Sequence, residues 1–396
     1  MASEQASLSI ARSRPAPWRD PRIRAIVFQV AFVVGVVGFI GFLVHNMLGN
    51  IARQNIATGF GFLKREAAFG IGESLIAYSP ADTYARAFLV GLSNTLYVAA
   101  LGIVLATIVG TVMGLARLST NWLVAKLAQV YVETFRNIPL LLQLFFWWGL
   151  LNTTAPSPRQ AWQVLPDVFV SNRGVTFPIP AASPAHHWVG LAFVVGIVLT
   201  FALRRWAARR QAATGAQFPT GWATLGLIVG LPVIAFIAGG APLALDVPAL
   251  KGFNFSGGSS ISPEFTALLM GLVIYTGTFI AEIVRAGILA VNWGQSEAAM
   301  ALGLKPGQRM RLVVLPQALR VIIPPLTSQY LSLTKNSSLA VAIGYPDLVS
   351  IANTTMNQTG QAIEGITMIM AVYLVISLAI SLAMNLYNRA VRLVER

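Results

Sequence analysis

Stretches without charged residues are the feature that most restricts what this chain can fold into. Residues 87–116, for example, lie uncharged between Arg86 and Arg117. A helix needs about 20 apolar residues to cross a hydrocarbon core about 30 Å thick, since each residue rises about 1.5 Å. Over the whole chain 56% of the residues are hydrophobic and 11% are charged, which is more apolar surface than a soluble core of 396 residues could bury. The sequence therefore predicts an all-α integral membrane protein.

The lengths of the apolar runs predict about eight transmembrane helices. One of them, residues 321–345, is irregular because Pro324, Pro325 and Lys335 interrupt it. Irregular backbone persists at membrane depth only where it is buried in protein or lines a cavity. The first run follows a basic leader and has no small-x-small cleavage site, so we interpret it as an uncleaved anchor. The seven regular runs are residues 25–44, 87–116, 137–158, 188–203, 221–240, 265–284 and 365–388.

The distribution of Lys and Arg predicts which side of the membrane each loop faces. With eight spans, 20 of the 28 Lys and Arg residues fall on the side of the N-terminus. Cytoplasmic loops carry such an excess, so we predict a multi-pass protein with both chain ends in the cytoplasm. The same loops account for the net charge of +14, and we therefore expect no nucleic-acid partner.

The residue types also exclude several kinds of site. The chain has no Cys, and its three His residues, at positions 45, 186 and 187, match no metal-ligand spacing. A paired nucleophile and base are not evident either. We therefore predict no disulfide, no bound metal and no catalytic residue in this chain.

One polar loop between predicted spans, residues 291–320, carries the signals of a short helix. Asn292 can cap this helix, with Gln295 three residues later, and Gly303 followed by Pro306 can end it. Small residues on one face would let the backbone of a partner approach closely. A helix that rests on the lipid headgroups explains the same pattern equally well. The residues of that face are Ala298, Ala301 and Leu302.

The same loop resembles the signature motif of the permease subunits of ABC importers. The motif residues are Glu297, Ala298, Ala299, Gly303, Val313, Leu315 and Pro316, with Val313 where the family often has Ile. The resemblance implies a type I ABC importer permease core, whose short helix docks into a cytoplasmic ATP-binding subunit and transmits its closure to the spans. The sequence has no Gly-x4-Gly-Lys-Ser/Thr phosphate loop, so ATP and Mg²⁺ are expected in that separate subunit and no cofactor in this chain.

Longer stretches are similar to the polar amino-acid uptake permeases, which usually have five spans. Residues 131–150, 275–291, 315–326 and 333–348 carry this resemblance, and residues 171–180 and 251–265 resemble the longer, general L-amino-acid permeases. The permease core would then have two parts, joined and preceded by additions. The four expected segments are 1–86 (basic leader, extra anchor and periplasmic segment), 87–151 (first part of the core), 152–261 (insertion with two extra spans) and 262–396 (second part of the core).

The resemblance also implies a set of partners in the bacterial inner membrane. They are cytoplasmic ATP-binding subunits, a periplasmic amino-acid-binding protein, and a second permease subunit, with a heterodimer favoured over a homodimer. The complex would move L-amino acids, a broad range of polar ones, from the periplasm to the cytoplasm. The binding protein would do most of the selecting, so the sequence does not predict which amino acids are carried.

Two pairs of charged residues lie close to span ends. Glu282 and Arg285 are one helical turn apart, and Glu133 and Arg136 repeat that spacing before another span. Each pair could act as a gate. The favoured interpretation is an ion pair that stabilises its own helix by a few tenths of a kcal/mol.

Lys335 is the one basic residue that the predicted spans leave within the membrane. An ammonium group is costly there, by roughly 2.5–3.5 kcal/mol, so it needs a carboxylate, a carbonyl or water as partner. With its neighbours Asn336, Ser337 and Ser338 it could form a polar stop on the substrate path. Alternatively, it interacts with helix-end carbonyls or extends to the membrane surface, which lysines often do.

An ion-coupled secondary amino-acid transporter is the alternative function. Such a carrier buries carboxylates at the middle of its spans, and the sequence offers only Glu282, near a span end. This makes an ABC permease the better prediction. A membrane-bound enzyme would need a catalytic set that the sequence does not supply.

Overall fold

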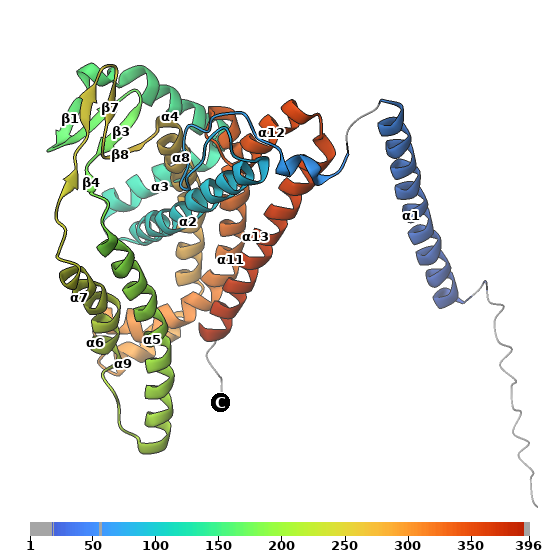
Figure 1. The fold of residues 1–396 in the computed structure, drawn as a ribbon. Helices are drawn as coiled ribbons and strands as arrows, with labels where there is room; N and C mark the ends of the chain where they lie inside the picture. Colours follow the sequence, from blue (N-terminus) through green and yellow to red (C-terminus); the bar gives the residue numbers. More distant parts are fainter. Residues whose placement is uncertain (1–17, 19, 55–57, 392–396) are drawn as a thin grey trace, which may run out of the picture.

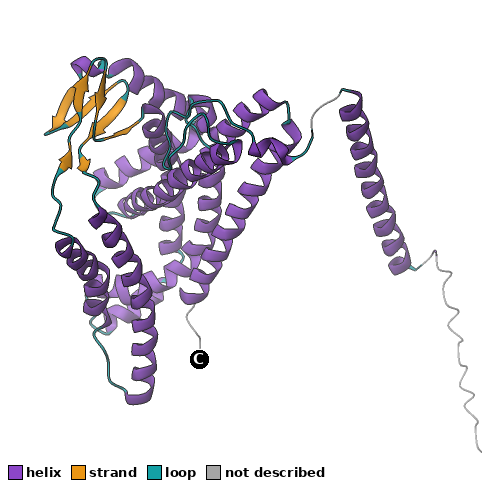
Figure 2. Ribbon diagram, in the orientation of Figure 1, coloured by secondary structure: helices purple, strands orange, loops and turns teal. Residues whose placement is uncertain are grey.

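The computed structural model describes residues 18, 20–54 and 58–391, and the predicted basic leader lies almost wholly outside them. Helices dominate the described residues, as Figures 1 and 2 show. Seven helical stretches in this part of the chain are long and apolar enough to cross a membrane. They are α1 (Pro21–Arg53), α2 (Tyr84–Ala116), α5 (Pro184–Thr214), α6 to α7 (Thr220–Ala238), α8 (Pro263–Leu289), the stretch Pro306–Ile343 that contains α11 (Leu315–Asn336), and α13 (Ala362–Val391).

The remaining predicted span, residues 137–158, is a shorter helix than expected. Its helix α4 runs from Leu140 to Thr154, after α3 (Trp122–Asn137). Ile138 separates the two with extended backbone, φ −92° and ψ 126°. The residue before a proline avoids the helical conformation, and Pro139 follows Ile138, so α3 ends there and α4 starts afresh.

Helices α2 and α8 form the centre of the molecule through close contact of small residues. A β-carbon on Gly110 would lie 2.5 Å from the β-carbon of Ile280, and one on Gly114 would lie 2.7 Å from the carbonyl oxygen of Ala281. Real β-carbons cannot approach so closely, so only Gly fits at these two positions. The Gly110 and Gly114 pair therefore serves helix packing within the chain.

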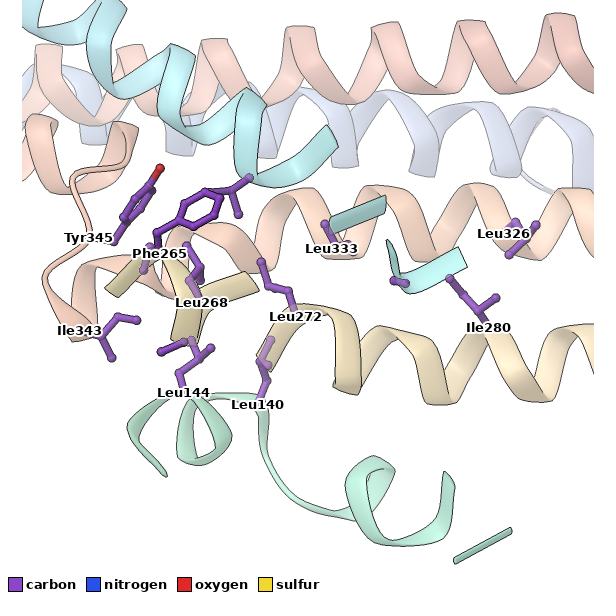
Figure 3. Close-up of a cluster of buried hydrophobic side chains, with 14 of the residues drawn as sticks. Leu140, Leu144, Phe265, Leu268, Leu272, Ile280, Leu326, Leu333, Ile343 and Tyr345 are labelled. Atoms are coloured by element: carbon purple, nitrogen blue, oxygen red, sulfur yellow. The ribbon is translucent and has the colours of Figure 1, made fainter. Parts of the chain in front are cut away.

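A buried apolar cluster joins α4, α8 and α11 near one end of this core. Leu140 and Leu144 of α4 pack with Leu268 and Leu272 of α8, and Leu333 of α11 belongs to the same cluster (Figure 3). Leu144, Leu268, Leu272 and Leu333 are fully buried. The cluster therefore anchors the short helix α4 to the central helices.

Helix α11 corrects one prediction about residues 321–345. Both Pro324 and Pro325 lie inside the helix, which continues to Asn336 and passes into a 3₁₀ turn, η6 (Ser337–Ile343). The prolines remove backbone donors but keep a φ that suits a helix, so the backbone is not unwound before Lys335. The predicted interruption is therefore wrong, and the irregular part begins only at η6.

The insertion contains small antiparallel sheets that the sequence analysis did not predict. Four strands pair in the order β1-β2-β3-β8, and two further pairs are β4–β5 and β6–β7. In Figure 1 the sheets lie at one end of the core, and α5 and α7 extend from them toward the other end. The strands are β1 (Trp162–Leu165), β2 (Val168–Ser171), β3 (Gly174–Phe177), β4 (Ile179–Pro180), β5 (Leu245–Asp246), β6 (Ala249–Lys251), β7 (Asn254–Ser256) and β8 (Ser259–Ile261).

Strand pairing brings the two ends of the insertion together. Val175 of β3 pairs with Ile261 of β8, and Phe177 pairs with Ser259. Ser262, directly after β8, caps α8 by accepting a hydrogen bond from the backbone N–H of Phe265 at 3.0 Å. The extra spans therefore leave the core and return to it at the N-terminus of α8.

Candidate functional site

The loop between α8 and α11 folds into the short helix α9 (Trp293–Ala301). The side chain of Asn292 caps it, accepting a hydrogen bond from the N–H of Gly294 at 2.8 Å. At the other end Gly303 has a φ of +73°, and the N–H of Leu304 donates to the carbonyl of Ala299 at 3.1 Å. A left-handed residue closing the last turn is a common helix stop. Both predicted ends of this helix are confirmed, although Gln295 does not complete the capping box.

The two faces of α9 differ in a way that matters for binding. Ser296 and Ala299 are buried against the chain, whereas Ala298, Ala301 and Leu302 are exposed. Leu302 is 81% exposed, and Trp293 at the start of the helix is 66% exposed. The described part of the chain therefore leaves the predicted small and apolar face of α9 uncovered. Glu297 is also exposed, but it is the fifth residue of α9, and no acidic residue lies in the first turn of this helix.

A wide helical turn connects α9 to the long helix α11. After α10 (Pro306–Arg309), residues Met310–Val314 form a π-helix, η5, and α11 begins at Leu315. The wide turn lies directly before Pro316, whose ring would clash with the carbonyl four residues earlier in a regular helix. Gln317 of α11 donates a hydrogen bond of 3.4 Å to the side chain of Gln295 on α9. A short stretch of chain and one side-chain hydrogen bond therefore join α9 to α11.

Glu282 and Arg285 form the predicted ion pair, and the structure adds a third member. Arg285 donates to Oε1 of Glu282 through Nη2 at 2.6 Å, and Arg117 donates to Oε2 of the same carboxylate. Arg117 caps the C-terminus of α2, so the carboxylate links α2 to α8. Side-chain exposure is 16% for Arg117 and 29% for Glu282. The pair is thus part of an ion-pair network that joins α2 to α8.

Glu133 and Arg136 do not form the predicted pair. Glu133 accepts a hydrogen bond from Gln129 at 2.7 Å, and the guanidinium of Arg136 lies 5.1 Å from the ring centre of Phe279. Both charged side chains are exposed. Each therefore has its own partner, and Arg136 connects α3 to α8 by a cation–π contact.

Lys335 lies in the last turn of α11, next to the predicted polar residues. Its side chain is exposed, and its carbonyl accepts a hydrogen bond from the hydroxyl of Ser338 at 2.7 Å. Ser337 is 1% exposed and donates to the carbonyl of Thr334. Asn336 is the last residue of the helix. These four residues therefore lie together where α11 ends, at the far end from α9.

A buried polar group near this end of α11 was not predicted from the sequence. Asp347 is 0% exposed and caps α12 (Leu348–Thr359) by accepting a hydrogen bond from the N–H of Ser350 at 2.8 Å. Its second oxygen, Oδ2, has no hydrogen-bond partner. Burial raises the pKa of Asp347 to about 7. A lone acidic residue before a helix gave no signal that the fold would bury it.

The described spanning helices, with a short helix whose apolar face is uncovered at one end, define a multi-span membrane protein. The chain belongs to the family of binding-protein-dependent transport system inner membrane components, whose family model matches residues 102–393. It is therefore a multi-pass permease subunit of the inner membrane and not itself the ATPase. The family works with ATP-binding subunits and substrate-binding proteins.

Curated relatives match almost the whole chain. The General L-amino acid transport system permease protein AapQ of Rhizobium johnstonii is 53% identical over 377 residues, 95% of this chain and 94% of that protein. The Putative amino-acid ABC transporter permease protein YhdX of Escherichia coli is 53% identical over 95% of this chain and 96% of its own length. The Glutamate/glutamine/aspartate/asparagine transport system permease protein BztB of Rhodobacter capsulatus is 43% identical, with 95% and 96% covered.

Proposed function

We propose that this chain is the permease subunit of an ATP-driven importer that carries L-amino acids, with polar ones in a broad range. The names of relatives that are 53% identical over 95% of the chain support this substrate class. The alternative, an ion-coupled carrier, has little support. Glu282, the carboxylate that such a carrier would use, is held by Arg117 and Arg285. A carboxylate with two cationic partners is a poor site for a coupling ion.

The proposed coupling to an ATP-binding subunit is based on the exposed face of α9. We infer that the motif residues of this loop dock α9 into the ATP-binding subunit, which binds ATP and Mg²⁺, and that its closure moves α11. The motif residues are Glu297, Ala298, Ala299, Gly303, Leu315 and Pro316. Of these, the exposed Glu297, Ala298 and Gly303 would contact the partner, and the buried Ala299 would hold α9 against the chain. The end of the molecule with α9 then faces the cytoplasm, as do both chain termini, and the sheets face the periplasm. A second, similar permease completes a heterodimer.

We propose that the chain consists of a permease core and two additions to it. Residues 87–151 and 262–396 supply α2, α8, α11 and α13, which make up the permease core. Residues 1–86 and 152–261 are additions that bring one extra span and two extra spans. The pairing of β3 with β8 supports this division, because it lets the insertion leave the core and return at one place.

Replacing Gly303 tests the coupling role. An added β-carbon at Gly303 meets no atom of this chain within 4 Å, but the φ of +73° strains any side chain there, so the test needs a control with the same backbone strain. We expect Gly303→Asp to reduce import about tenfold or more, because an interface then has to bury an unpaired charge. Receptor-stimulated ATP hydrolysis and co-purification of the ATP-binding subunit are the measurements.

Gly360 offers a matched control for this test. It also has a positive φ, +72°, and open space around its position, but it follows α12 at the other end of the molecule. Gly360→Asp should leave association with the ATPase unchanged. Wild-type import and ATPase binding by Gly303→Asp would show that α9 does not form this interface.

We further propose that the exposed polar face of α11 lines the substrate path. Ser328, Ser332 and Lys335 are exposed and recur at helical spacing, and the half-buried Asn336 and Ser338 extend the polar surface. Ser337 is buried and does not contribute to this surface. Lipid is a poor neighbour for such a face, so water or the second permease is expected to cover it. Lys335→Met keeps the aliphatic stem and removes the charge. We expect it to raise the half-saturation concentration for import severalfold, and an unchanged value would leave Lys335 with a structural role.

A further inference from the structure

A cavity of about 220 Å³ lies where both additions to the permease core meet it. The segment before α2 contributes Glu73, and β8 with the partner strand β3 contributes Ser260 and Phe177. The core contributes aromatic rings from α2, α8 and the turn after η6. At about 30 Å³ for each water molecule, this volume corresponds to about seven waters, the size of a small amino acid.

The carboxylate of Glu73 is held in place by groups of the core. Its Oε1 accepts a hydrogen bond from the N–H of Ser262 at 2.9 Å, at the start of α8. The side chain of Asn94, 1% exposed, donates to the carbonyl of Glu73 at 2.9 Å and to that of Pro346 at 2.9 Å. Asn94 is therefore a positioning residue that fixes this segment against α2 and η6.

The charge of Glu73 is not balanced within the described part of the chain. Ion pairs there join Glu282 to its two arginines, and none involves Glu73. Burial raises the pKa of Glu73, and the nearby carboxylate of Glu264 acts in the same direction. A cationic group that entered the cavity would offset both effects.

Aromatic rings line the same cavity as Glu73. The rings of Tyr97 and Phe265 are stacked, with centres 5.4 Å apart, and Tyr345 lies 5.9 Å from Phe265. Figure 3 shows Phe265 and Tyr345 side by side at the top of the apolar cluster. Aromatic faces attract ammonium groups and also contact aliphatic side chains. The cavity thus offers one anionic partner and an apolar wall.

We propose that this cavity is a binding subsite for free L-amino acids at the sheet-bearing end of the permease. Glu73 accepts the α-ammonium group, and the wall of Tyr97, Phe265 and Tyr345 contacts the side chain. The subsite rests on the proposed function, because it assigns a first stopping point to the amino acid that the permease imports. It also gives the two additions a shared role, since neither builds the cavity alone.

The test uses the full transporter complex in lipid nanodiscs without the binding protein. Because this chain has no Cys, Ser74→Cys at the cavity can carry a fluorine label whose NMR signal reports on this site. The probe is L-glutamine, and 4-carbamoylbutanoate is the same molecule without the ammonium group. We expect L-glutamine to shift the signal saturably and the analogue to bind much more weakly.

Two variants separate the carboxylate of interest from its neighbour. Glu73→Gln keeps an acceptor for the N–H of Ser262 and should weaken binding of L-glutamine about tenfold or more, the effect of losing a charged hydrogen bond. Glu264→Gln keeps an acceptor for Trp148, which donates to Glu264 at 3.0 Å, and should weaken binding far less than Glu73→Gln does. Equal binding by Glu73→Gln and the parent, equal binding of the analogue, or no saturable shift would overturn the subsite.

Uptake into proteoliposomes with the binding protein is measured in parallel. If the parent complex imports no amino acid in the presence of ATP, the proposed function fails. The fluorine signal decides the subsite separately, since it is recorded without transport.

Discussion

Helices α1 and α8 both qualify as membrane spans, yet they have opposite surroundings. The most apolar window of α1 has a mean hydropathy of 2.6 and is 0% buried by the chain, whereas that of α8 has 1.9 and is 61% buried. Figure 1 shows α1 apart from the other helices. Lipid tails are as apolar as leucine side chains. High hydropathy therefore predicts that a helix crosses the membrane, but it does not predict whether lipid or protein surrounds the helix.

Glycine illustrates the same contrast at single positions. In α1, a β-carbon added to Gly35, Gly38 or Gly41 would meet no atom within 4 Å. In α8, a β-carbon on Gly271 would lie 2.5 Å from a methyl carbon of Leu144. The residue type is the same in both helices. In α8 and its partner α2, but not in α1, the missing side chain creates a contact, and this comparison can be tested by filling the space.

The largest expected effect comes from filling the contact between α2 and α8. Gly110→Val would place a β-carbon 2.5 Å from Ile280 and 2.8 Å from the carbonyl of Gly277. Overpacking of this kind costs about 3 kcal/mol or more where the neighbours include backbone. We expect little folded protein after extraction in detergent, measured by size-exclusion chromatography and by the melting temperature of the purified remainder.

Gly38→Val in α1 is the matched control, because it adds the same side chain to another spanning helix. It should leave the yield and the melting temperature of the protein unchanged. If both variants were equally stable, the close approach of α2 and α8 would be wrong. If both were equally damaged, α1 would have a protein partner in the assembled complex.

The sequence predicts where these helices lie along the chain but not which residues of other helices they contact. Uncharged runs mark α2, and Asn292 and Gly303 mark the ends of α9, since spans and caps are local properties. The link from Arg117 to Glu282 joins residues 165 positions apart, and no local pattern announces it. The strands were missed for a related reason. Ser259–Ile261 is too short for an alternating pattern, and it becomes a strand by pairing with residues 175–177.

A smaller effect is expected from disrupting the ion pairs that join α2 to α8. Glu282→Gln removes the charge that pairs with Arg117 and Arg285 and leaves the guanidinium of Arg117 half-buried. We expect a loss of about 1–2 kcal/mol, the range for hydrogen bonds to partly exposed charged groups. Thermal unfolding of the detergent-purified protein measures it.

Glu133→Gln is the control for this second variant. Glu133 is exposed and bonded to Gln129, so its change should stay within about 0.5 kcal/mol. Equal melting temperatures for the two variants would mean that Glu282 does not fasten the helices. A destabilised Glu282→Gln protein that still imports amino acids at the rate of the parent would confine the role of Glu282 to packing and would argue against a gate.

The smallest effect is expected from the buried carboxyl group of Asp347. The pKa of Asp347 rises from 3.8 to about 7 on folding because the carboxyl is buried. Between these values the folded state binds more protons than the unfolded state, so stability is greatest at low pH and falls as pH rises toward 7. Asp347→Asn keeps the acceptor for Ser350 and removes the titration. From pH 5 to pH 8 we expect the melting temperature of the parent to fall by a few degrees more than that of Asp347→Asn. The same slope in both proteins would show that Asp347 does not stay protonated in the folded core, and the comparison would then rest on packing alone.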